Sequence, residues 1–72
     1  MHLRGELRPD LTEREREILQ LVADGGTSRS IAVRCKVSDQ TIKNELSAAY
    51  AKLGALSRAH AVAVGLRRGV LN

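Results

Sequence analysis

Residues Thr27–Leu53 read TSRSIAVRCKVSDQTIKNELSAAYAKL, and this stretch decides the fold. Thr27 and Ser38 each precede a helical pattern, and a hydroxyl at that position accepts a backbone N–H of the first helical turn. Between the two predicted helices, Lys36 and Val37 leave room only for a tight corner. A short helix, a three- to four-residue turn and a longer helix form the helix-turn-helix pattern, whose second helix enters the DNA major groove.

The second helix of this pattern has two contrasting faces. One is an apolar stripe at helical spacing, formed by Ile42, Leu46, Ala49 and Leu53. The other is short and polar, and it carries Gln40, Lys43, Asn44, Ser47 and Ala51. Gln and Asn can bond adenine edges, and Lys can reach guanine or a phosphate. A polar face also occurs on any amphipathic helix in solvent, so the DNA interpretation depends on the caps, the turn and the net charge together.

The composition fits one small basic domain. The chain has 72 residues and a formal net charge of +4, with one Tyr, no Trp and no Phe. The core must therefore be aliphatic. A chain this short is only marginally stable alone, so a second copy or a larger host protein would stabilise it. Nine of the twelve cationic side chains are Arg, which favours contacts with phosphates and bases.

Several classes of function are disfavoured by the sequence. Cys35 is the single cysteine, so no internal disulfide forms, and His2 and His60 have no metal-ligand partners at motif spacing. Gly25-Gly26 lacks the Lys-Ser/Thr of a phosphate-binding loop. No run is apolar enough to cross a membrane, and no signal peptide is visible. We therefore expect a cytoplasmic protein that is not an enzyme and uses no metal or cofactor.

The N-terminal part divides into a short segment and a first helix. Residues 1–10 have no periodicity, and we expect a flexible arm or linker there, with the domain at 11–72. Thr12 and Glu15 form a capping box at the start of a helix predicted to run to Ala23. Gly25 and Gly26 are expected to end this helix.

A last helix is predicted at about Arg58–Arg68, with Ser57 as its N-cap. Its apolar residues are small and lie almost all round the axis, so the helix needs two neighbours. One face can pack on the domain. The other face can be covered by another domain of a larger protein, or it can pair with a second copy through Ala59, Val62, Ala63 and Leu66. Residues 70–72 are expected to fold back or fray.

Taken together, these residues resemble the LuxR/GerE-type helix-turn-helix domain. Leu11–Leu19 is similar to that family's opening LTxREREVL, and Ala23–Gly25 is similar to its AxG. Val37–Lys43 is similar to ISxxTVK, Lys52–Gly54 to KLG, and Arg58–Val62 to the RxxAV that begins the last helix. The match covers nearly the whole chain in the right order and spacing.

The resemblance implies an all-α domain of four helices, in the winged-helix-like superfamily but without a wing. It implies a bacterial transcription regulator whose third helix, at about 39–53, lies in the major groove. It also implies a homodimer formed through the last helix, at about 58–68. Thr41 and Lys43 match family positions that contact DNA, and positions 40, 44 and 47 match those that vary base preference.

Three departures from the family pattern matter. Position 45 is usually His, a phosphate contact, and here Glu45 repels phosphates, accepts from a cytosine amino group or turns away. Ser30 replaces the usual Glu, so the second helix is expected to lack its capping-box partner. Cys35, Ala49 and Ala55 are smaller than the usual residues, which suggests a looser core.

Two hypotheses follow. In the first, the chain is a sequence-specific, dimeric DNA-binding regulator, either free-standing or the C-terminal domain of a longer protein. The residues assigned to DNA are Thr41, Lys43, Gln40, Asn44, Ser47, Arg29, Arg34 and Lys36. In the second, the chain is a protein-interaction module with the same fold. It would dock on RNA polymerase like a sigma-factor region-four domain, or pair with a full-length regulator. Salt-dependent affinity for duplex DNA separates the two.

Overall fold

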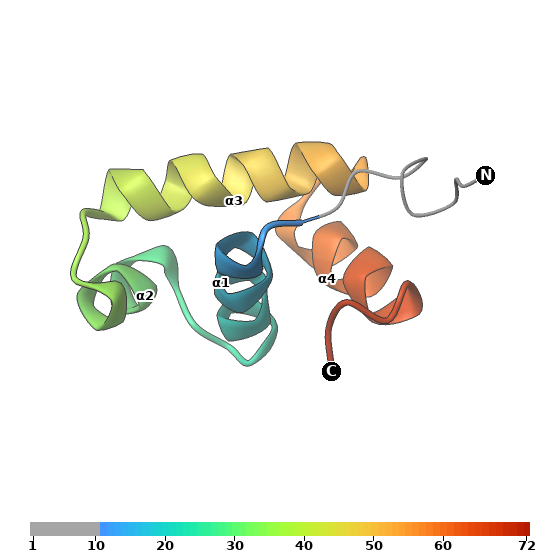
Figure 1. Ribbon diagram of the computed structural model, residues 1–72, viewed down its shortest axis with the longest axis horizontal. Helices are drawn as coiled ribbons and strands as arrows, with labels where there is room; N and C mark the ends of the chain where they lie inside the picture. Colours follow the sequence, from blue (N-terminus) through green and yellow to red (C-terminus); the bar gives the residue numbers. More distant parts are fainter. Residues whose placement is uncertain (1–10) are drawn as a thin grey trace.

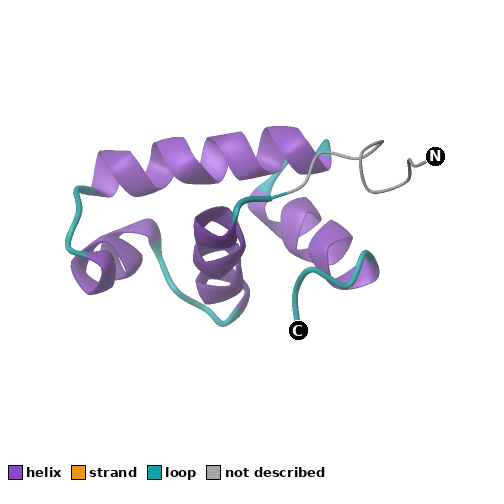
Figure 2. Ribbon diagram, viewed as in Figure 1, coloured by secondary structure: helices purple, strands orange, loops and turns teal. Residues whose placement is uncertain are grey.

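The computed structural model describes residues 11–72, which form four helices and no strand. They are α1 (Glu13–Ala23), α2 (Ser28–Cys35), α3 (Asp39–Leu53) and α4 (Arg58–Arg67). In Figure 1, α3 runs along one edge of the molecule, and the other three helices lie on one side of it. Figure 2 shows the short connections between them. The all-α, four-helix prediction is confirmed, and the predicted arm at 1–10 lies outside the described residues.

Hydroxyl side chains fix where the helices begin. Thr12, Thr27, Ser38 and Ser57 are the four N-caps, and each accepts a backbone N–H from the third residue of its helix. The expectation that α2 lacks a capping-box partner is wrong. Ser30 Oγ accepts the backbone N–H of Thr27 at 3.0 Å, and Ser30 N–H is bonded to Thr27 Oγ1 at 3.0 Å. The Ser30 hydroxyl therefore makes the capping-box bond that a Glu side chain usually makes at this position.

The helices end in left-handed turns. After α1, Gly26 N–H bonds the carbonyl of Leu21 at 2.9 Å, and the corresponding bonds follow the other three helices. Lys36 closes α2 with φ of 61°, the one non-glycine residue with positive φ in the described part of the chain. The turn between α2 and α3 is thus as tight as predicted. Helix α4 ends at Arg67, one residue earlier than predicted, because Arg68 is its C-cap.

The core is aliphatic and draws on every helix. The predicted stripe of α3 is buried. The buried apolar side chains are Ile18, Leu19, Val22, Ile31, Ala32, Ile42, Leu46, Ala49, Leu53, Ala61, Val64 and Leu71. The C-terminal residues fold back, which is one of the two outcomes expected for residues 70–72. Asn72 N–H bonds Gln20 Oε1 at 3.0 Å. Gly65 faces Leu71 so closely that a Cβ would lie 2.6 Å from Leu71 Cδ1.

In the described residues, no helix has the length and apolarity that a membrane span requires.

Candidate nucleic-acid interface

The exposed face of α3 is polar and uncluttered. Gln40, Lys43, Asn44 and Ser47 are all exposed, as the helical spacing predicted. Gln40 Nε2 donates to Asn44 Oδ1 at 2.9 Å. Because α3 lies at the edge of the molecule (Figure 1), this face is open to a partner as large as a duplex.

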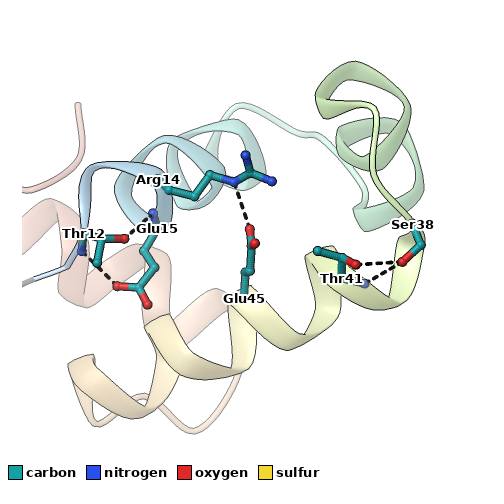
Figure 3. Close-up of polar contacts among 6 residues, drawn as sticks. All are labelled: Thr12, Arg14, Glu15, Ser38, Thr41 and Glu45. Atoms are coloured by element: carbon teal, nitrogen blue, oxygen red, sulfur yellow. Dashed lines mark hydrogen bonds and ion pairs between the residues drawn. The ribbon is translucent and has the colours of Figure 1, made fainter.

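Thr41 is placed differently from the other predicted contacts. It is half-buried, and its hydroxyl oxygen lies 2.8 Å from Ser38 Oγ (Figure 3). Its backbone N–H also donates to Ser38 Oγ at 3.0 Å. Thr41 therefore supports the N-cap of α3, and its DNA contact stays a prediction.

The three predicted phosphate contacts outside α3 are exposed but spread apart. Arg29 lies in the first turn of α2, and Lys36 lies in the corner before α3. Arg34 lines a groove of about 420 Å³ between α1 and α2, together with Arg14 and Arg16. Lys43 is absent from that groove's lining. The structure thus does not bring Arg34 together with Lys43.

Lys43 instead lines a second groove, of about 270 Å³, that sequence reasoning missed. Ser47 and Tyr50 line it from α3, Ser28 from the start of α2 and Arg58 from the start of α4. Two cations, Lys43 and Arg58, favour an anion there. Helical spacing alone does not show that Ser28 at the start of α2 and Arg58 at the start of α4 line one groove.

Tyr50 keeps its hydroxyl proton in this groove. Burial raises the pKa of the phenol above its ordinary value of 10.0, and the positive charge of Arg58 opposes that shift. The neutral hydroxyl is a hydrogen-bond donor. It therefore suits the same anionic ligand as the cations beside it.

Glu45 turns toward α1. Its Oε1 accepts from Arg14 Nε at 2.9 Å, and Figure 3 shows the two side chains reaching toward each other between α3 and α1. The side chains are 44% and 31% exposed, so the pair contributes little stability. Three alternatives were expected for Glu45: repulsion of phosphates, a bond to cytosine, or turning away. In the structure without DNA, Glu45 turns away from the exposed face of α3.

A second ion pair joins α3 to α1. Glu15 Oε1 accepts from Lys52 Nζ at 2.7 Å and from the backbone N–H of Thr12 at 2.9 Å. The hydrogen bond from Lys52 is the main cause that lowers the pKa of Glu15 below its ordinary value of 4.5, while burial acts in the opposite direction. Lys52 and Glu15 lie on different helices, so helical spacing alone could not identify this pair.

The predicted dimer residues lie on α4 as an open apolar stripe. Ala59, Ala63 and Leu66 are exposed, and Val62 is half-buried. Leu56, just before α4, is 91% exposed and was not predicted. His60 Nδ1 accepts the backbone N–H of Leu56 at 3.0 Å. This bond fixes the backbone of Leu56 to the first turn of α4.

Within residues 11–72, no three His, Cys, Asp or Glu side chains gather into a possible metal site. Cys35 is a free, half-buried thiol packed against the core.

A short helix, a tight turn and a longer helix with an exposed polar face define this chain as a helix-turn-helix domain. The model of the family described as bacterial regulatory proteins, luxR family, matches residues 9–64, and the chain belongs to that family. It is therefore a transcription-regulator domain with a DNA-binding helix-turn-helix.

Two relatives from Bacillus subtilis (strain 168) differ in length. The spore germination protein GerE is 41% identical over 64 residues, which are 89% of this chain and 86% of GerE. The transcriptional regulatory protein YdfI is 43% identical over 61 residues, which are 85% of this chain and 29% of YdfI. The chain thus spans most of one relative and less than a third of the other.

Solved structures share the fold. The structure of the transcription factor GerE has a TM-score of 0.81 and 39% identity, covering 86% of this chain and 92% of that one. A complex of Vibrio cholerae VqmA with a ligand and DNA has a TM-score of 0.79 and 33% identity. The match covers 85% of this chain and 27% of the VqmA chain. A VqmA dimer without target DNA has a TM-score of 0.85 and 29% identity. The match covers 97% of this chain and 33% of the VqmA chain.

Proposed function

We propose that the chain binds specific DNA sequences with α3 in the major groove. The observation that carries this proposal is the exposed face of α3, on which Gln40, Lys43, Asn44 and Ser47 stand without a bulky apolar neighbour. Amides and ammonium groups suit the donors and acceptors of base edges. The fold of a VqmA–DNA complex supports the same docking.

The groove beside α3 is assigned to the DNA backbone. Lys43, Ser28 and Arg58 face one space there, where a phosphate can accept from cations and from helix N-termini. Arg29 and Lys36 are exposed at the two ends of α2 and add phosphate contacts in this proposal. Arg34 lies in the other groove, so we assign it only a long-range electrostatic attraction to the DNA.

The regulator is proposed to act as a homodimer through α4, in the cytoplasm. Ala59, Ala63 and Leu66 leave an apolar stripe exposed, and small side chains permit two helices to approach closely. A dimer of VqmA shares this fold, which supports pairing. Two copies related by a two-fold axis would read two half-sites one helical turn apart.

Fluorescence anisotropy tests the proposal. The purified chain is titrated with a labelled random-sequence duplex at several salt concentrations, and a site selection from a random library follows. We expect the affinity to fall steeply with salt, because phosphate contacts release counterions, and we expect one sequence to be enriched. Absence of binding at low salt with micromolar protein would overturn DNA recognition.

A second candidate is a protein-interaction module, which docks on RNA polymerase or pairs with a full-length regulator. Leu56 and Leu66, exposed by 91% and 50%, favour it. Glu45 also favours it, because a carboxylate stands where the resemblance implies a phosphate-contacting His. Such a module would associate with protein and show no salt-dependent affinity for duplex DNA. The same titration therefore separates the two candidates.

A further inference from the structure

Gln40 and Asn44 form one polar unit on the exposed face of α3. Gln40 Nε2 lies 2.9 Å from Asn44 Oδ1, and both side chains are exposed. They are one turn apart in the first half of α3, and the N-terminal residues of a recognition helix are those that contact base edges. The two amides are thus joined before any DNA binds.

The bond between them determines what the unit offers to a ligand. Each side-chain amide has a carbonyl acceptor and an NH₂ donor. The mutual bond occupies one lone pair of the Asn44 oxygen and one proton of Gln40. The Gln40 oxygen and the Asn44 NH₂ group stay wholly free for a ligand, and Gln40 keeps a second N–H proton. If both amides are rotated by 180°, the unit still presents one acceptor and one donor. This pattern is therefore independent of the amide orientation.

Adenine is the base that complements this pattern. In the major groove adenine presents the N7 acceptor beside the N6 amino donor, whereas guanine presents two acceptors, cytosine a donor and thymine an acceptor with a methyl group. We propose that Gln40 and Asn44 together read one adenine in each half-site. One amide oxygen accepts from N6, and the neighbouring NH₂ donates to N7. This inference rests on the proposed function.

The neighbours on α3 leave the unit available. Lys43 and Ser47 line the groove that leads to Arg58. The carboxylate of Glu45 is held by Arg14 Nε at 2.9 Å, on the flank that faces α1. Because each amide restrains the other, less side-chain freedom is lost on binding. The unit should also act as a whole, so the loss of either amide should remove the preference.

Site selection with variants tests the inference. The whole chain and the variants Gln40→Ala, Asn44→Ala and the double variant are each selected against one random duplex library. The duplex chosen by the original chain is then rebuilt with 7-deazaadenine, which lacks N7, or with purine, which lacks the N6 amino group. Glu13→Gln, on the exposed surface of α1 and outside the proposed interface, is the control, and circular dichroism checks that every variant folds.

We expect the selected half-site to contain a fixed adenine. Each base analogue should weaken binding of the original chain roughly 5- to 150-fold, the range for one bidentate contact. Both single variants and the double variant should lose the preference at that one position to the same extent, and Glu13→Gln should keep it. A fixed cytosine or guanine instead, insensitivity to the analogues, or additive losses at two positions would overturn the inference. If the original chain enriches no sequence, the proposed function itself fails.

Discussion

Lys52 Nζ lies 2.7 Å from Glu15 Oε1, and this ion pair joins the end of α3 to the first turn of α1. Glu15 is only 12% exposed and also accepts the backbone N–H of Thr12. One carboxylate thus completes the cap of α1 and fixes the helix that carries the candidate interface. Other exposed ion pairs, such as Arg14 with Glu45, have less influence on stability.

The first prediction concerns the pH dependence of stability. The pKa of Glu15 is lowered in the folded chain, mainly by the hydrogen bond from Lys52. The unfolded chain therefore takes up this proton first as the pH falls. The resulting stability is present above the ordinary pKa of 4.5 and is lost as the pH falls through the lower folded value. Glu15→Gln should reduce the stability by about 1 kcal/mol at pH 7.

Urea unfolding followed by circular dichroism at a series of pH values measures this effect. The difference between the original chain and Glu15→Gln should shrink below pH 4.5. Glu13→Gln is the matched control, because Glu13 pairs with Arg16 on the surface of the same helix. An unchanged difference down to strongly acidic pH would contradict the role assigned to Glu15.

The second prediction concerns the contact between Gly65 and Leu71. Alanine favours a helix over glycine by about 1 kcal/mol, but at Gly65 its Cβ would lie 2.6 Å from Leu71 Cδ1. Overpacking of this kind costs about 1–3 kcal/mol, so Gly65→Ala should destabilise the chain slightly. In a Leu71→Ala background the same change should stabilise it. Equal effects in both backgrounds, measured by urea unfolding, would rule out the contact as the cause.

The third prediction concerns the left-handed residue at the corner before α3. Lys36 has φ of 61°, a conformation that costs a side-chain residue about 1 kcal/mol and glycine much less. Relief of this strain outweighs the extra freedom that glycine gives the unfolded chain, so Lys36→Gly should raise the free energy of unfolding by about 0.5–1 kcal/mol. Lys36→Ala removes the charge and keeps the backbone strain, so it should show no such gain. Thermal unfolding of the two variants side by side measures the difference.

Much of the fold was predictable because its signals are local. The hydroxyls of Thr12, Thr27, Ser38 and Ser57 and the glycines after the helices mark boundaries within a few residues of themselves. The apolar spacing likewise identified the stripe of α3 that packs into the core. The error at Ser30 arose because a short hydroxyl can make the bond that a Glu usually makes.

The site was less predictable because parts of it depend on packing. Ser28 and Arg58 lie 30 positions apart in the sequence and meet beside Lys43 only when α2 and α4 pack on α3. The direction of Glu45 is set by Arg14 from another helix. The exposure of Leu56 is likewise a property of the loop before α4. Residues on one helix, such as Gln40 and Asn44, could be placed from helical spacing alone.

The fourth prediction concerns the groove beside α3. Lys43→Ala should weaken DNA binding by about 1–3 kcal/mol if the side chain reaches a base as well. Arg58→Ala should lower the affinity for all sequences alike and reduce the slope of log affinity against log salt by about 1, because one phosphate contact is lost. Arg67→Ala, which removes a cation from the other end of α4, should leave the slope nearly unchanged. Anisotropy titrations across salt measure all three, and equal slopes for Arg58→Ala and Arg67→Ala would remove the phosphate site from this groove.

The fifth prediction concerns the apolar stripe of α4. Leu66 is 50% exposed on the stripe formed with Ala59 and Ala63. A carboxylate there would be buried next to its own copy in a two-fold interface, and buried like charges oppose association. Leu66→Asp should therefore shift the chain to monomer in sedimentation equilibrium and abolish cooperative binding to paired half-sites. Binding to a single half-site should stay unchanged. Val33→Asp is the matched control, because Val33 is 74% exposed on α2, away from α4. If Val33→Asp disrupts association and Leu66→Asp does not, the dimer forms through another surface.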